Sequence, residues 1–380
     1  PMTRYVIRRL LASIPVILGV ITLVFILARV IPGDPCVAAY GEKATEEVCS
    51  AFEERYGLND PIFPFIIKDD AGVHLTPDPS SIVDNQFVTY LGSLVQGDLG
   101  TSIRFGRPVT EILIERLPIT VQLTVFALFF ASIVGIILGL AAATRRNSPA
   151  DVGTMVIANL GVSTPVFVLG LVLQIIFAVW LAGTVLALPP SGVLAPGTEV
   201  VPVYAAWGFP DYDGFLKPFL DFVSNMYIVN GIITLNWELF ADATAHMILP
   251  AIAVGTIPLA IIARMTRSSL LEVLGLDFIR TARAKGLRER FVIIRHGMRN
   301  ALLPVVTVIG LSVAGFLSGA ILTETIFNLP GIGRTLFEAI QGRDYIVIQG
   351  VTIVVAIGYI LVNLIVDVSY AFLDPRIRLG

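Results

Sequence analysis

The sequence predicts an all-α polytopic membrane protein with six transmembrane helices. Only 14% of its 380 residues are charged and 55% are hydrophobic, whereas soluble domains carry roughly 25% charged residues. The mean hydropathy is +0.82. The apolar residues gather in runs of about 20, the length of helix that crosses a hydrocarbon core about 30 Å thick. These observations exclude a disordered chain, a coiled coil and an ordinary soluble enzyme.

Six runs contain almost no Asp, Glu, Lys or Arg, with Arg29 and Asp367 as the exceptions. The first run is longer than the apolar core of a signal peptide, which has about 7 to 15 residues, so we expect it to remain as a membrane helix. The predicted spans are residues 10–31, 119–143, 154–181, 243–263, 301–323 and 346–372.

Basic residues predict the orientation, because Lys and Arg in short loops stay on the cytoplasmic side. Most of the 26 Lys and Arg residues lie at the two termini and in the connections after the second and fourth spans. We therefore expect both termini to be cytoplasmic. The chain then divides into an N-terminus with the first helix (1–31), an extracytoplasmic cap (32–118) and a five-helix core (119–380). The core contains a second extracytoplasmic segment (182–242) and a cytoplasmic basic segment (264–300).

Both cysteines of the chain, Cys36 and Cys49, lie in the predicted extracytoplasmic cap. Disulfides persist in that compartment, and a bridge that closes so short a loop stabilises the folded state by about 3 kcal/mol. The alternative is a pair of unbridged thiols, and the sequence leaves both possibilities open.

The sequence contains no motif for enzyme chemistry. It lacks a phosphate-binding loop, a His-Glu-x-x-His motif and a Gly-x-Ser-x-Gly motif, and its three histidines are far apart in the chain. We therefore predict no catalytic residue and no metal site. The net charge of −3 argues against nucleic acid as a partner, and membrane lipid is the expected environment.

Uncharged polar residues within the spans are candidates for a translocation pathway. Asn159, Ser163 and Gln174 fall within about 60° of one another on a straight helix, so they predict a polar face on the third span. Gln122 and Asn363 are expected to face the same cavity. Hydrogen bonds between helices are the alternative role for each of these residues. No span carries an ionisable residue near its middle, which disfavours a proton-coupled transporter.

The basic segment is expected to contain a short helix over residues 278–285. Asp277 is suited to the N-cap of this helix, and Gly286 to the left-handed conformation that ends it. Small and cationic side chains share its surface, which suits docking into a groove of another protein. The alternative is a solvated basic loop that only determines orientation.

The residues of this segment resemble the cytoplasmic coupling loop of the dipeptide and oligopeptide permeases, which are binding-protein-dependent ATP-binding-cassette importers. The resemblance is to the first, or B-type, permease subunit. It covers nearly the whole chain, through short motifs in the same order. They lie at residues 31–35, 56–61, 97–102, 116–120, 278–287, 295–304, 323–333 and 374–378.

The resemblance implies a type I importer permease fold and a heteromeric complex in a bacterial-type plasma (inner) membrane. The chain would form half of the translocation pathway, beside a C-type second permease, two ATP-binding-cassette ATPase subunits and an extracytoplasmic solute-binding protein. It would hold no cofactor itself, because ATP and Mg would bind in the ATPase subunits. Peptides are the implied substrate; nickel chelates, glutathione and oligosaccharides are alternatives, and a channel or secondary transporter acting alone is a remote one.

The resemblance also assigns roles to residues. We expect contacts with the ATPases from polar side chains at Arg280, Arg283 and Lys285 and from small ones at Ala282 and Ala284, with Asp277, Thr281 and Gly286 completing the coupling site. The family signature begins Glu-Ala-Ala where this chain has Arg280-Thr281-Ala282, so the salt bridge of that glutamate is not expected here.

The residues after the fifth span are expected to form an outer gate or a docking surface for the binding protein. They are Glu324, Phe327, Pro330, Gly331 and Gly333. Two stretches of the outside segments, residues 68–85 and 199–237, look longer than in typical members, so both extracytoplasmic segments are expected to be enlarged.

Overall fold

The computed structural model describes residues 2–30, 35–64, 66–69, 72–75 and 82–373. Most of the motif at 31–35, part of the stretch at 68–85 and the closing motif at 374–378 lie outside the described residues. The described part is almost entirely helical. Its two short strands, β1 (Ile66–Asp69) and β2 (Gly72–Leu75), pair antiparallel, with Ile66 opposite Leu75.

Five described helices are long and apolar enough to cross a membrane: α1 (Met2–Val30), α5 (Val109–Thr144), α11 (Trp237–Leu274), α14 (Arg299–Ile326) and α16 (Tyr345–Leu373). A bent pair adds a sixth span if it is counted as one. The prediction of six membrane-spanning segments in an all-α protein is therefore confirmed, with a correction to the third.

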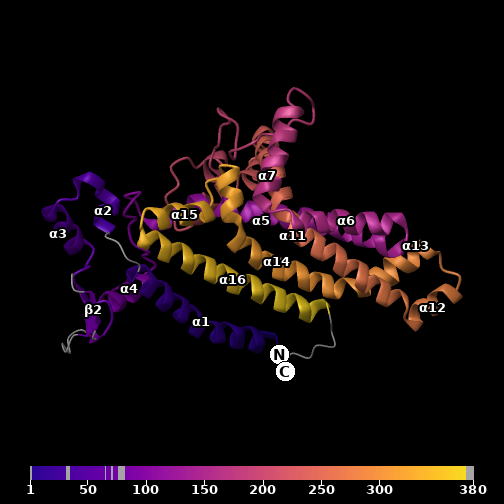
Figure 1. Cartoon of the computed structure of the whole chain (residues 1–380), viewed down its shortest axis with the longest axis horizontal. Coiled ribbons are helices and arrows are strands. Elements are labelled where there is room, and N and C mark those ends of the chain that lie inside the picture. The colour runs from indigo at the N-terminus through magenta and orange to yellow at the C-terminus, as the bar shows by residue number, and fades with distance from the viewer. Residues whose placement is uncertain (1, 31–34, 65, 70–71, 76–81, 374–380) are drawn as a thin grey trace. The chain divides into compact units, whose positions relative to one another are not determined.

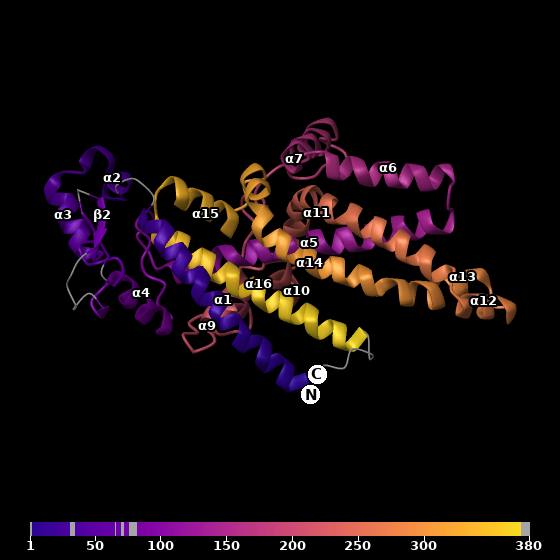
Figure 2. The ribbon, with the colours of Figure 1, turned by 60° about the horizontal axis from the view of Figure 1, so that its bottom comes forward.

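The third span is not one straight helix. It consists of α6 (Pro149–Ser163) and α7 (Val166–Gln174), which continues into π-helical turns at Ile175–Trp180, and the two parts are bent by 104°. Figures 1 and 2 both show α7 turning away from α6. The cause is Pro165, which has no N–H to donate and disfavours helical geometry at the residue before it. Thr164 accordingly adopts φ −86° and ψ 122°.

The chain forms two compact units. The first contains residues 1–11, 115–334 and 358–380. Its core lies where α5, α11 and α14 meet, and large buried side chains there include Leu123, Met247 and Phe327. Glycines allow these helices to approach closely, since a Cβ built at Gly139 would lie 2.5 Å from the carbonyl oxygen of Ala263.

Shorter helices connect the spans of this first unit. Between α7 and α11 lie α8 (Val203–Ala206), α9 (Lys217–Ser224) and α10 (Tyr227–Ile233). Between α11 and α14 lie α12 (Asp277–Ala284), α13 (Glu289–Phe291) and π-helical turns at Val292–Met298.

The second unit contains residues 12–114 and 335–357. It includes α2 (Pro35–Tyr40), a 3-10 turn (Gly41–Lys43), α3 (Glu46–Arg55), α4 (Gln86–Val95) and most of α15 (Ile332–Gln341). Phe25 is fully buried among Phe63, Phe87 and Tyr90. A disulfide joins Cys36 on α2 to Cys49 on α3. Of the two alternatives that the sequence leaves open, the structure contains the bridge.

Candidate functional site

Helix α12 lies in the basic segment, and most of its residues are exposed. It begins at Asp277, whose carboxylate lies 3.3 Å from the Arg280 guanidinium. The N-cap position belongs to Leu276 and has no side-chain hydrogen bond, so the prediction of Asp277 as N-cap is wrong by one residue. The prediction for Gly286 is confirmed: its φ is +74°, and its N–H donates to the carbonyl oxygen of Arg283.

One face of α12 packs against the chain itself. Ile279 and Ala282 are buried against Val292, with Val273 and Leu274 beside them. Ala282 was predicted to contact a partner, and this is wrong. The apolar face of α12, which includes Ala282, is buried against the chain's own residues. The exposed face holds the other predicted coupling residues: Asp277, Arg280, Thr281, Arg283, Ala284, Lys285 and Gly286.

Two internal contacts involve exposed side chains of α12. The Arg283 guanidinium donates to both carboxylate oxygens of Glu289, at distances of 2.7 to 3.2 Å, and these hydrogen bonds raise the pKa of Arg283. The Thr281 hydroxyl donates to the Asp277 carbonyl oxygen. Arg280 and Lys285 project from the helix into solvent. Exposed Phe278 adds an apolar side chain to this surface that the sequence did not single out as a contact.

The predicted gate residues are mostly buried. Glu324 is 0% exposed, and its carboxylate accepts hydrogen bonds from the Thr120 hydroxyl at 2.6 Å and the Arg334 N–H at 2.8 Å. The same Thr120 oxygen accepts from the Ile332 N–H. Glu324 therefore holds the turn after α14 against α5.

The turn after α14 needs glycine where it meets Glu324. A Cβ at Gly333 would lie 3.0 Å from a carboxylate oxygen, and one at Gly331 would overlap the carboxylate. Phe327 is 1% exposed and lies in the core. Burial of Glu324 and Phe327 excludes them from a docking surface on this unit, while a role in an outer gate, with Pro330 at the same turn, stays a prediction.

The predicted polar face of the third span does not exist as one surface. Asn159 and Ser163 lie on α6, and the bend places Gln174 on a different helix. The Gln174 amide instead donates to the carbonyl oxygens of Pro190 and Ile326, and Gln122 is buried and accepts from the Ile228 N–H. Both follow the alternative of internal hydrogen bonding. Asn363 is half-buried on α16, and its role in the pathway stays a prediction.

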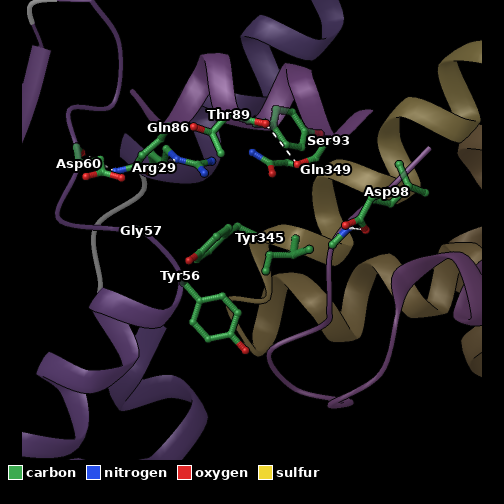
Figure 3. A pocket seen from close by; sticks show the side chains of 14 residues that line it. Arg29, Tyr56, Gly57, Asp60, Gln86, Thr89, Ser93, Asp98, Tyr345 and Gln349 are labelled. Atoms are coloured by element: carbon green, nitrogen blue, oxygen red, sulfur yellow. Dashed lines mark hydrogen bonds between the residues drawn. The ribbon is translucent and has the colours of Figure 1, made fainter. Parts of the chain in front are cut away.

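A cavity of about 160 Å³ lies within the second unit (Figure 3). The Arg29 guanidinium stacks 3.7 Å over the Phe25 ring and donates to Gln86, whose amide donates in turn to the Asp60 carbonyl oxygen. Further residues of its lining are Tyr56, Thr89, Tyr90, Ser93, Asp98, Tyr345 and Gln349.

Several polar atoms around this cavity have no bonding partner. Within the described residues, the Tyr90 and Tyr345 hydroxyls and the Gln349 amide nitrogen form no hydrogen bond. Donors beside a guanidinium suit ordered water or an oxygen-rich group such as a carboxylate. Throughout the described ranges, the cavity included, no group of three or more His, Cys, Asp or Glu residues is placed to hold a metal ion.

Comparison with known proteins decides what kind of protein carries these features. Residues 135–379 match the family described as the binding-protein-dependent transport system inner membrane component, and residues 2–124 match the N-terminal membrane component of such systems. The chain belongs to this family. It is a multi-pass membrane permease.

Several relatives match this permease over nearly its full length. The dipeptide transport system permease protein DppB of Escherichia coli strain K12 is 42% identical over 99% of both chains. DppB of Alkalihalophilus pseudofirmus is 41% identical over 99% of this chain and 100% of its own. The oligopeptide transport system permease protein AppB of Bacillus subtilis is 35% identical over 99% and 100% of the two chains.

Sequence reasoning singled out the basic segment of the permease but missed the cavity. The signal was present, because the motifs at 56–61 and 97–102 supply Tyr56, Asp60 and Asp98 to its lining. Their partners Arg29 and Tyr345 come from distant parts of the chain, so only the folded structure shows that these residues surround one cavity.

Proposed function

We propose that this permease forms half of the translocation pathway of an ATP-driven, binding-protein-dependent importer of di- or oligopeptides. The observation that carries the proposal is the identity of 41% and 42%, over 99% of the chain, to proteins named dipeptide transport system permeases. A relative named for oligopeptide transport, at 35% identity, extends the proposed substrate class to longer peptides.

The proposed complex contains a C-type second permease, two ATPase subunits and an extracytoplasmic solute-binding protein in a bacterial-type plasma membrane. Both termini and the basic segment lie in the cytoplasm, as the distribution of Lys and Arg indicates. ATP and Mg bind to the ATPase subunits, and this permease hydrolyses nothing. Its cytoplasmic contact is the exposed face of α12, where Arg280 and Lys285 are available to pair with acidic side chains of an ATPase.

The test is to purify the permease gently through a tag, identify the proteins that accompany it and measure ATP hydrolysis with binding protein and peptide. We expect a second permease and ATPase subunits in stoichiometric amounts, and hydrolysis that a peptide-loaded binding protein stimulates. Stimulation only by a nickel chelate, glutathione or an oligosaccharide would keep the architecture and change the substrate. Recovery of the permease alone, from membranes that contain its neighbours, would refute the proposal.

A further inference from the structure

An ion pair joins buried Asp151 at the start of α6 to partly exposed Arg267 in the second half of α11. Asp151 is only 3% exposed, and both of its carboxylate oxygens accept from one guanidinium: Arg267 Nε at 2.7 Å and a terminal nitrogen at 2.8 Å. The Asn147 N–H donates to the same carboxylate at 2.9 Å. Two-point pairing of this kind specifies orientation as well as distance.

A second polar contact links the same two helices. The Arg264 guanidinium donates to the side-chain oxygen of Asn159 at 3.0 Å. Arg264 lies one turn before Arg267 on α11, and Asn159 lies further along α6 than Asp151. Helix α6 packs along α11, and thus the two helices are held together at two points.

Helix α11 leads directly into the proposed coupling helix. It ends at Leu274, and α12 begins at Asp277. The buried face of α12 packs on Val273 and Leu274 of α11. A force applied to α12 therefore reaches α11 through direct packing, and Arg267 lies two turns before the end of α11.

Beyond the bend, α7 packs on α11 as α6 does, and it also contacts the end of α14. Gly170 faces Phe327, where an added Cβ would lie 3.1 Å from the ring. Gln174 donates to the carbonyl oxygen of Ile326 at 3.2 Å. Helix α7 is thus held by the end of α14 in addition to α11, and the non-helical joint at Thr164 and Pro165 separates it from α6.

We propose that Asp151 and Arg267 are positioning residues of the transport cycle, which tie α6 to α11 so that movement of the coupling helix carries α6 with it. The joint at Thr164 and Pro165 absorbs the resulting motion relative to α7. This inference rests on the proposed function. A pair that serves only stability would affect assembly and leave the ratio of transport to hydrolysis unchanged.

The first measurement leaves Asp151 and Arg267 unchanged. Distances between pairs of spin labels are measured in the assembled importer, with and without trapped nucleotide. The labels are attached to cysteines introduced at three exposed positions: Ile157 on α6, Ile261 on α11 and Val179 after α7. Only these cysteines react, because the two native cysteines are bridged. We expect the distance from 157 to 261 to stay the same in both states and the distance from 157 to 179 to change. A change in the distance from 157 to 261 would overturn the proposal.

The second measurement compares Asp151→Asn and Arg267→Gln with Arg145→Gln, which removes an exposed cation from the same connection. Peptide transported per ATP hydrolysed is measured at equal amounts of assembled complex. We expect this ratio to fall at least fivefold in the two pair variants and to be unchanged in the control. A wild-type ratio in the pair variants would overturn the inference, and if they fail to assemble, the distances above decide it. Absence of peptide-stimulated hydrolysis in the wild type would instead refute the proposed function.

Discussion

Gly286 shows how a single backbone conformation determines where α12, the proposed coupling helix, ends. Its φ of +74° lies in the left-handed region, which costs a residue with a Cβ about 1 to 2 kcal/mol. No atom lies within 4 Å of a built Cβ, so the requirement for glycine here is conformational and not steric.

We therefore predict that Gly286→Val strains the end of α12 and reduces the coupling of ATP hydrolysis to transport. Gly286→Asn is the matched control, because asparagine tolerates this conformation far better than a β-branched residue. The measurement is the ratio of peptide transport to ATP hydrolysis in proteoliposomes. Equal ratios for the two variants would contradict this account of the helix end.

Thr120 is a second residue whose role is local and testable. Its hydroxyl donates to buried Glu324 and accepts from the Ile332 N–H, so Thr120→Val removes one hydrogen bond from the Glu324 carboxylate and one from the Ile332 N–H. Each such loss costs about 1 to 3 kcal/mol. The expected result is a clear fall in the midpoint of thermal unfolding of the purified permease in detergent.

The control for this prediction is Thr325→Val, at the residue next to Glu324 on α14. Thr325 is exposed and bonds only within its own helix, to the carbonyl oxygen of Ile321, among the contacts described. Its loss should change the midpoint little. A similar fall of the unfolding midpoint in both variants would show that the hydrogen bonds around Glu324 do not contribute specially to stability.

At the scale of elements, the contact between α5 and α11 depends on the absence of side chains. A Cβ at Gly139 would lie 2.5 Å from the Ala263 carbonyl oxygen and 2.6 Å from Thr266 Cβ. Neither neighbour is the flexible end of a side chain, so the helices themselves would have to separate.

Gly139→Ala is therefore expected to lower the thermal stability of the permease, even though alanine favours the helical conformation by about 1 kcal/mol over glycine. Gly153→Ala on α6 is the control, because nothing lies within 4 Å of its built Cβ. That variant should be neutral or slightly stabilising. A Gly139 variant as stable as the control would mean that α5 and α11 are less closely packed than described.

At the scale of the whole molecule, the distribution of charge predicts on which side of the membrane each segment lies. In a background where the two native cysteines are replaced by serine, Trp207→Cys should react with a membrane-impermeant maleimide in cells whose inner membrane is intact. Lys285→Cys should react only after the membrane is opened. Both positions are exposed, so accessibility within the fold does not bias the comparison. The reverse pattern would invert the proposed orientation.

Much of this molecule was predictable because the signals are local. A run of about 20 apolar residues predicts a span wherever it lies, and Gly286 predicts the end of α12 from its own conformational freedom. The contacts that concern function were less predictable. Ala282 looked like a partner contact and packs inside the chain. Glu324 and Phe327 were expected to form an outer gate or a docking surface, and their burial excludes only the docking surface.

The sequence by itself determined the class of protein, the approximate spans and the position of the basic segment, because these follow from hydropathy, basic residues and contiguous motifs. Only the tertiary structure decided that Pro165 bends the third span by 104° rather than leaving it intact, since proline is also tolerated within α5, α11 and α14. Only the tertiary structure paired Asp151 with Arg267, 116 positions apart. Long-range pairing depends on how helices pack, and a single sequence carries no direct record of that packing.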